Sequence, residues 1–174
     1  RIAVAGSIRR RCEIVGDIEI VAQPRVVPEY DLFENWIGER PQVREITRIL
    51  VDMGLEKIKG GEKYQKRRIP YEVSGIPGEL DLHLDLFLVT PPSTWAVIFM
   101  QRTGPWQFSK KMVTKKSHGG FMPGEYKIKN GRVVDTWEMD EINQPDTERG
   151  LFGMWGMEYL KPWEREGYLV KERS

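Results

Sequence analysis

The chain lacks the features that mark secreted and membrane proteins. Cys12 is the only cysteine among 174 residues, so no internal disulfide can form. No apolar run approaches the roughly 20 residues that a membrane helix needs, and the first residues lack the apolar stretch of a secretory signal. We therefore expect no membrane association and an intracellular location, which would be the cytoplasm, a nucleoid or, for a viral protein, the host cell.

Size and composition indicate a compact globular protein. At 174 residues and 20.3 kDa the chain fits one domain or two small ones, which excludes a large multidomain enzyme. Hydrophobic residues make up 40% and aromatic residues 10%, enough for a core, while 30% charged residues and a mean hydropathy of −0.50 favour a soluble protein. The sequence contains no internal repeat and no low-complexity segment.

Charge is balanced overall but unevenly distributed. The net charge is +1, yet the stretch from residue 102 to 132 holds eight basic residues and one acid, and residues 133 to 158 hold seven acids and one arginine. A second basic stretch contains Lys57, Lys59, Lys63, Lys66, Arg67 and Arg68. Two separated basic segments favour a polyanion-binding surface on one side of the protein, although solvated lysines on ordinary surface elements give the same pattern.

The first half of the chain predicts alternating helices and strands. We expect a short helix over 8–13 with Ser7 as its N-cap and a strand over 14–22 with one polar face. Apolar residues at helical spacing predict an amphipathic helix that starts at Pro41 and is closed by Gly54. A hairpin is expected around Gly60-Gly61, and strict alternation predicts a strand over 80–88.

The second half begins with a change in composition. We expect a short apolar strand over 95–100, a turn at 102–105 and a basic helix that carries Phe108 and Met112 and stops near Gly119-Gly120. Asn130-Gly131 between two alternating arms predicts a hairpin over 125–137. A last helix is expected over 147–155.

Three carboxylates are candidates for a metal site. Asp17 and Glu19 lie two positions apart on a strand, so they project from the same face, where they would repel each other without a cation between them. Isolated pairs of this kind are most often plain surface carboxylates. Asp85 emerges from the polar face of another strand as a third acid, and Asp81 on the same strand competes for this role.

A phosphate-binding turn precedes these acids. Gly6-Ser7 stands before a helical start, where a small residue lets backbone N–H groups approach a phosphate. Arg10 follows one turn later, on the same side as Ser7. Carboxylates, a Gly-Ser turn and an arginine together suit phosphoryl or nucleotidyl transfer with two metal ions.

The motif and its spacing resemble a known family. The stretch from Gly6-Ser7-Ile8-Arg9-Arg10 to Gly16-Asp17-Ile18-Glu19 is similar to the G-S-x-R-R…G-D-x-D signature of the DNA polymerase X family, a group of nucleotidyltransferases. Leu84-Asp85-Leu86, Arg102-Thr103-Gly104, Phe108 to Met112 and the segment from Leu151 to Glu166 also look like parts of that family. Residues 1–24 and 80–167 carry the resemblance.

The resemblance implies roles for individual residues. Asp17, Glu19 and Asp85 would be the catalytic residues and the ligands of two Mg²⁺ or Mn²⁺ ions. Residues expected to contact the incoming nucleotide are Gly6, Ser7, Arg10, Gly16, Arg102, Gly104, Trp106, Ser109 and Lys110. Contacts to the phosphate backbone of DNA are expected from Lys63, Lys115 and Lys116, because such contacts supply most sequence-independent affinity.

The resulting expectation is an α+β protein with a mixed-sheet palm over 1–103 and a small thumb over 104–174. It would be a monomeric DNA polymerase that adds deoxynucleotides to a DNA 3′ hydroxyl and releases pyrophosphate, in gap filling or repair. Its partners would be DNA, as primer-template or gapped duplex, and a nucleoside triphosphate.

Two other functions stay open. Gln101-Arg102 stands where the family commonly has an aromatic pair that screens the sugar, which favours ribonucleotides or a non-DNA acceptor. Glu19 in place of the family's second aspartate, and the lack of the helix that usually precedes the Gly-Ser strand, favour a DNA gap-binding or end-binding module without catalysis. We interpret His83, His118 and Cys12 as structural residues.

Overall fold

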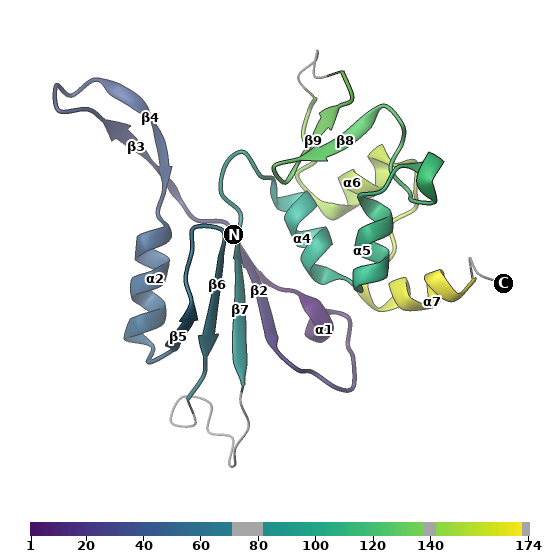
Figure 1. Ribbon diagram of the computed structural model, residues 1–174, viewed down its shortest axis with the longest axis horizontal. Helices are drawn as coiled ribbons and strands as arrows, with labels where there is room; N and C mark the ends of the chain where they lie inside the picture. The colour runs from purple at the N-terminus through teal and green to yellow at the C-terminus, as the bar shows by residue number, and fades with distance from the viewer. Residues whose placement is uncertain (71–81, 138–141, 172–174) are drawn as a thin grey trace.

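The computed structural model describes residues 1–70, 82–137 and 142–171. It shows an α+β fold with a five-stranded sheet and two separate hairpins, and six α-helices lie within these residues. Figure 1 shows the sheet with one helix on its left and a mostly helical part on its right. The expected α+β class and mixed sheet are confirmed.

The five-stranded sheet places strands that are far apart in the sequence next to each other. Its order is β1-β2-β7-β6-β5, with β2 and β7 parallel and the other neighbours antiparallel. The strands are β1 (Ile2–Val4), β2 (Ile18–Ala22), β5 (Glu56–Lys59), β6 (Tyr64–Arg68) and β7 (His83–Leu88). The central pair β2–β7 therefore joins segments more than sixty residues apart in sequence.

One face of the sheet is covered by α2 (Val43–Asp52). Leu84, Leu86 and Leu88 of β7 point to this side and pack with Leu50 and Leu55 in one buried cluster. The leucine alternation that predicted β7 is thus the alternation of a strand with a buried face. Partly buried residues at helical spacing on α2, Val43 and Ile46, complete the cluster.

The other face is half covered. Val21, Phe87 and Val89 form a second cluster with Ala5, next to α1 (Gly6–Arg9), and with Phe99 of α4 (Trp95–Thr103). These apolar residues occupy the carboxyl-end half of β2 and β7. The polar residues of the same face lie two and four positions before Val21 and Phe87, outside this apolar cluster. They are Asp17, Glu19, His83 and Asp85.

A third and larger cluster fills the C-terminal part. Its buried aromatic residues are Phe108, Phe121, Phe152 and Trp155, and the indole N–H of Trp155 donates to the carbonyl of Met112 at 2.7 Å. The elements around it are α5 (Trp106–Met112), β8 (Tyr126–Lys129), β9 (Arg132–Asp135), α6 (Glu148–Met154), α7 (Arg165–Lys171) and the 3₁₀ turns Lys116–His118 and Pro162–Glu164. The hairpin at Asn130-Gly131 and the helix ending before Gly156 were both predicted.

A two-stranded hairpin projects away from the sheet. Strands β3 (Val26–Tyr30) and β4 (Trp36–Pro41) pair only with each other, and Figure 1 shows them extending beyond the end of α2. Pro24 and Pro28 favour a loop with one or two short turns in this stretch, and the observed hairpin corrects that expectation. The turn between the strands is closed by Asp31, whose carboxylate accepts N–H bonds from Phe33 and Asn35.

Four local predictions are wrong. The basic helix expected to stop near Gly119-Gly120 ends at Met112 and is followed by the separate 3₁₀ turn Lys116–His118. Residues 95–100, expected as a strand, form the first two-thirds of α4. Pro41 ends β4 rather than opening α2. The first helix covers Gly6–Arg9 instead of 8–13, and Ser7 lies inside it and does not cap it.

The predicted palm–thumb boundary falls at the C-terminal end of α4. This helix contributes Ala96 and Met100 to the C-terminal cluster and Phe99 to the sheet cluster, so it belongs to both cores. None of the helices in the described ranges is long and apolar enough to cross a membrane.

Candidate active site

Two of the predicted carboxylates lie side by side on the sheet. Glu19 of β2 and Asp85 of β7 are register partners in the parallel pair, so their side chains leave the same face at the same level. Asp17, just before β2, is two positions from Glu19. All three stand on the half of the face that α4 leaves open.

Lys66 lies between two of these acids. Its Nζ is 3.6 Å from Oδ2 of Asp17 and 3.9 Å from Oδ1 of Asp85. Lys66 is also the register partner of Asp85 in the antiparallel pair β6–β7. Asp17 and Asp85 therefore already face one common cationic group.

Two further side chains complete the polar face. The Tyr64 hydroxyl donates to Oδ1 of Asp85 at 2.5 Å, and Nδ1 of His83 lies 3.6 Å from Oδ1 of Asp17. Burial, followed by the hydrogen bond to Asp85 and its negative charge, raises the pKa of Tyr64 to about 12. The phenol consequently stays protonated and remains a donor to Asp85.

Burial dominates the electrostatics of Glu19. Burial raises the pKa of the Glu19 carboxyl above its usual range; the nearby carboxylates Asp85 and Asp17 add to this, while Arg10 and Arg102 oppose it. Desolvation disfavours the ionised form, and it outweighs the arginines, which favour that form. A bound cation would favour the ionised carboxylate further.

The donor set suits a hard divalent cation. Within the described ranges no group of three His, Cys, Asp or Glu side chains is close enough to hold a metal ion as it stands. However, Asp17 and Asp85 both lie within 4 Å of the Lys66 ammonium, so they already share one cationic group. Carboxylate oxygens are also the ligands that Mg²⁺ prefers. A metal ion between Asp17 and Asp85 would have to displace the Lys66 ammonium, and Glu19 would have to turn toward it.

The Gly-Ser turn lies directly against the acids. Gly6 has a φ of +58°, and a Cβ there would lie 1.6 Å from Oε2 of Glu19. Only glycine permits this approach. The motif thus brings the start of α1 within contact of the Glu19 carboxylate, and Ser7 is half-buried on the same short helix.

The predicted arginines lie around the same carboxylate. Arg10 donates to the carbonyl of Thr103 at 2.6 Å and lies 3.4 Å from Oε1 of Glu166. A Cβ on Gly104, whose φ is +71°, would lie 2.8 Å from Nη1 of Arg10, which explains the glycine at this turn. The Arg102 guanidinium stacks 4.1 Å from the centroid of the Phe87 ring.

Helix α5 carries three of the residues predicted to bind the nucleotide. The Trp106 ring is 67% exposed, and the Lys110 ammonium lies 5.8 Å from its centroid. The Ser109 hydroxyl instead donates to the carbonyl of Gln101 at 3.0 Å, which ties α5 to α4. Trp106 is therefore exposed beside Lys110, and Ser109 has a structural bond.

The predicted DNA-contacting lysines differ in their surroundings. Lys63 is exposed and lines a cavity of about 280 Å³ together with Gln101 and Arg102. Lys115 Nζ donates to the carbonyl of Gly124 at 2.8 Å, and Lys116 Nζ donates to that of Trp155 at 3.3 Å. The last two thus bind loop carbonyls of the C-terminal part.

Gly16 and Asp81 need separate comment. A Cβ on Gly16 would meet nothing within 4 Å, so no neighbouring part of the described structure requires glycine there. Asp81, the weaker candidate for the third acid, lies outside the described residues.

Sequence reasoning did not assign Lys66, Tyr64 or Arg9 to the site. Lys66 and Tyr64 reach the acids through the β6–β7 register, for which the sequence gives no direct signal. Arg9 stands within the Gly-Ser motif; its guanidinium hydrogen-bonds Thr103 and pairs with Glu148 at 2.5 Å.

Comparison with known proteins adds no relative. No protein-family model matches the chain, and no curated protein matches it.

Proposed function

We propose that the protein is a nucleotidyltransferase of the polymerase X type, which adds deoxynucleotides to a DNA 3′ hydroxyl with release of pyrophosphate. One observation carries this proposal above the others. Glu19 and Asp85 are register partners on parallel strands, with Asp17 sharing Lys66 with Asp85 and Gly6 packed against Glu19. Acids and a Gly-Ser turn, predicted from separate segments, meet at one place.

The carboxylates would hold the metal ions. Asp17, Glu19 and Asp85 are the ligand candidates, and Mg²⁺ or Mn²⁺ bound there supplies activation of the attacking hydroxyl and stabilisation of the leaving phosphate. The residues around these carboxylates would bind the triphosphate. Ser7 and the backbone N–H groups beside Gly6 would donate to phosphate oxygens, and Arg10 and Arg102 would offset their negative charge.

The substrate surface is proposed from the elements around this site. Trp106 is exposed beside Lys110 at the start of α5, which suits stacking on a base. Lys63 and Arg102 line one cavity next to the sheet, which suits contact with phosphates of DNA or the nucleotide. These contacts support DNA and a nucleoside triphosphate as partners.

The test is primer extension on gapped DNA with Mg²⁺. Asp17→Asn should reduce the extension rate by at least about a hundredfold, the scale on which removal of a charge-stabilising catalytic group acts. Asp52→Asn, at the exposed end of α2, is the matched control and should keep the wild-type rate. Wild-type extension by Asp17→Asn would refute the proposal; parallel assays with ribonucleotides, with and without template, test the alternative substrates.

A second candidate, DNA binding without catalysis, is favoured by the position of Lys66. Its ammonium lies 3.6 Å from Asp17 and 3.9 Å from Asp85 and compensates part of their negative charge without a metal ion. Salt-sensitive DNA binding with no metal-dependent turnover in wild-type protein would support this candidate. Catalysis predicts that Lys66→Met lowers the Mg²⁺ concentration needed for half-maximal extension, because the metal no longer competes with the ammonium.

A further inference from the structure

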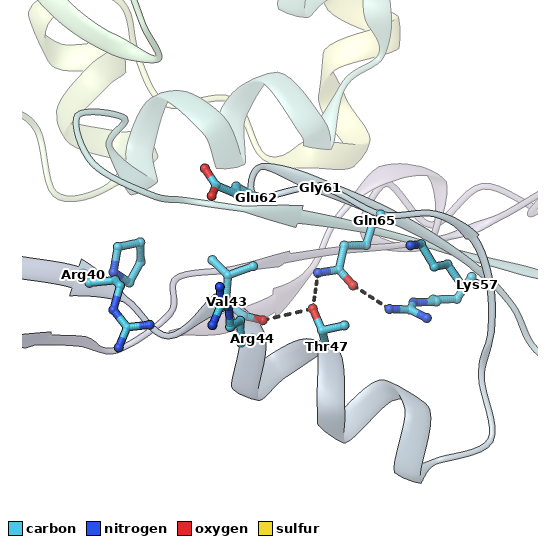
Figure 2. Close-up of a pocket in the computed structure, with 11 residues that line it drawn as sticks. Arg40, Val43, Arg44, Thr47, Lys57, Gly61, Glu62 and Gln65 are labelled. Carbon is cyan, nitrogen blue, oxygen red and sulfur yellow. Dashed lines mark hydrogen bonds between the residues drawn. The ribbon is translucent and has the colours of Figure 1, made fainter.

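A basic pocket lies on the opposite face of the sheet from the carboxylates. It has a volume of about 410 Å³ and is formed by the end of β4, the first turns of α2 and the β5–β6 hairpin. Figure 2 shows Arg40, Arg44, Lys57 and Glu62 around it. Among the described residues that line it, the cations are Arg40, Arg44, Lys57 and Arg67, and Glu62 is the one acid.

Strand alternation creates this pocket. Lys57 and Arg67 are register partners on β5 and β6 and both line it. Lys66, the next residue along β6, faces the carboxylates instead. The second basic stretch of the sequence therefore does not form one basic side, as the charge pattern predicted; it is divided between the two faces.

Arg67 is the most informative residue of the pocket. It is 1% exposed, and its Nε has no hydrogen-bond partner. No carboxylate among the described residues lies within ion-pair distance of it. Burying a guanidinium without an anion is costly, so an anionic ligand would remove this cost.

A chain of polar bonds fixes Arg67 at the pocket. Arg67 Nη2 donates to Oε1 of Gln65 at 2.9 Å, and Nε2 of Gln65 donates to the Thr47 hydroxyl at 2.7 Å. The Thr47 hydroxyl donates in turn to the carbonyl of Val43 at 3.1 Å, as the dashed lines in Figure 2 show. These hydrogen bonds fix the orientation of the Arg67 guanidinium. Because the partners are uncharged, they do not compensate its positive charge.

The start of α2 adds to the positive potential. Val43 and Arg44, its first residues, line the pocket, and the preceding Gln42 makes no side-chain capping bond. The N–H groups of a first turn have no partner within the helix and carry partial positive charge. Helix α2 has ten residues, which is long enough for this effect.

We propose that this pocket binds phosphate groups, as a site separate from the carboxylate site. Four cations and a helix start match a polyvalent oxyanion better than a single carboxylate. None of the described residues that line the pocket is aromatic, so they offer no stacking surface for a base. Its volume of about 410 Å³ leaves room for more than one phosphate group.

The linked phosphates have two possible sources with the same chemistry. They belong either to a free polyphosphate-bearing molecule or to the backbone of a nucleic acid strand. Titration with inorganic tripolyphosphate tests the first source, and titration with a short single-stranded oligonucleotide tests the second. Binding of either at this pocket supports the site, and the comparison of the two identifies the source.

The experiment uses calorimetric titration of the full chain without divalent metal ions. Arg44→Gln and Lys57→Gln are at exposed positions, which avoids the folding risk of changing buried Arg67. Each should weaken phosphate binding about tenfold, the value of one charge-assisted hydrogen bond. Arg48→Gln is the matched control, because Arg48 lies one turn further on α2, pairs with Glu45 at 2.8 Å and does not line the pocket.

Three results would overturn the site. They are no binding of either probe, equal weakening by Arg44→Gln and Arg48→Gln, and equal affinity for citrate and tripolyphosphate. Asp17→Asn should leave the Arg44-dependent binding unchanged, since Asp17 is on the other face. Failure of the pocket and failure of the proposed polymerase activity are therefore separate outcomes.

Discussion

At the scale of single residues, the contact between Gly6 and Glu19 decides the geometry of the site. The glycine has a φ of +58°, and the space of its missing side chain is filled by the Glu19 carboxylate. The position of the Glu19 carboxylate therefore requires a glycine at position 6 of the Gly-Ser turn. The two halves of the sequence motif are in direct contact, ten and more residues apart.

Gly6→Ala should therefore destabilise the protein and displace Glu19. The left-handed conformation alone costs a non-glycine residue about 1–2 kcal/mol, and the clash at 1.6 Å adds to it. Urea unfolding should show a loss of at least about 2 kcal/mol. Gly16→Ala is the matched control and should change stability by less than about 0.5 kcal/mol; equal losses in the two variants would contradict the account.

The charge state of Glu19 gives a second prediction at this scale. The pKa of this carboxyl is raised by burial, so its ionised form opposes folding. A group with a raised pKa contributes most to stability below its unfolded pKa, near about 4.3, and loses that contribution as pH rises through the folded value. Glu19→Gln, permanently neutral, should therefore be more stable than wild type at pH 7 and show a smaller difference at pH 4.

The measurement is urea unfolding at both pH values in EDTA. A stability gain at pH 7 that shrinks toward pH 4 is the expected result. A variant that is less stable than wild type at pH 7 would show that ionised Glu19 is favoured in the fold, against this interpretation.

At the scale of elements, some structure was predictable and some was not, for identifiable reasons. Strand β7 was predicted because Leu84, Leu86 and Leu88 face one buried cluster while Asp85 faces the other way. Helix α4 was misread as a strand. It packs into two cores at once, with Ala96 and Met100 on one side and Phe99 on the other, so it is apolar all round and has no helical stripe.

The candidate site shows the same division. The Gly-Ser turn, Asp17, Glu19 and Asp85 were predicted because each lies in a local motif or on an alternating strand. Lys66 lies between the acids because of the β6–β7 register, which joins segments that the sequence does not mark as neighbours. The Arg67 pocket depends on the register of the β5–β6 hairpin, which Gly60-Gly61 predicted without fixing which residues pair. Long-range register of this kind is set by the whole sheet.

The β3–β4 hairpin provides a prediction at the element scale. Leu32 is 99% and Phe33 84% exposed at its turn, so they bury little apolar surface. Replacing both with serine should change the free energy of unfolding by less than about 0.5 kcal/mol. Leu84→Ala, in the cluster under α2, should cost about 2–5 kcal/mol; a comparable loss in the hairpin variant would mean that the hairpin packs against the body in solution.

At the scale of the whole molecule, one buried ion network joins the two ends of the chain. Glu148 of α6 pairs with Arg9 of α1 at 2.5 Å and with Arg165 of α7 at 3.0 Å. Arg165 is fully buried; burial lowers its pKa, and Glu148 opposes this. The carboxylate thus compensates two cations between the sheet part and the C-terminal part.

Glu148→Gln should destabilise the protein by about 3–5 kcal/mol, because two guanidinium groups lose their shared anion. Glu158→Gln, at an exposed position, is the matched control and should change stability by less than about 0.5 kcal/mol. Urea unfolding followed by tryptophan fluorescence measures both. A loss below about 1 kcal/mol for Glu148→Gln would show that the network does not hold the parts together.

The central claim is that the carboxylates on the open half of the sheet hold divalent ions beside a triphosphate site. The most direct measurement is a crystal structure with Mn²⁺ and a non-hydrolysable deoxynucleoside triphosphate, with manganese located by anomalous scattering. We predict manganese contacting Asp17, Glu19 and Asp85, with the Lys66 ammonium displaced from between them. Manganese absent from these carboxylates, with Lys66 still bridging Asp17 and Asp85, would contradict the account.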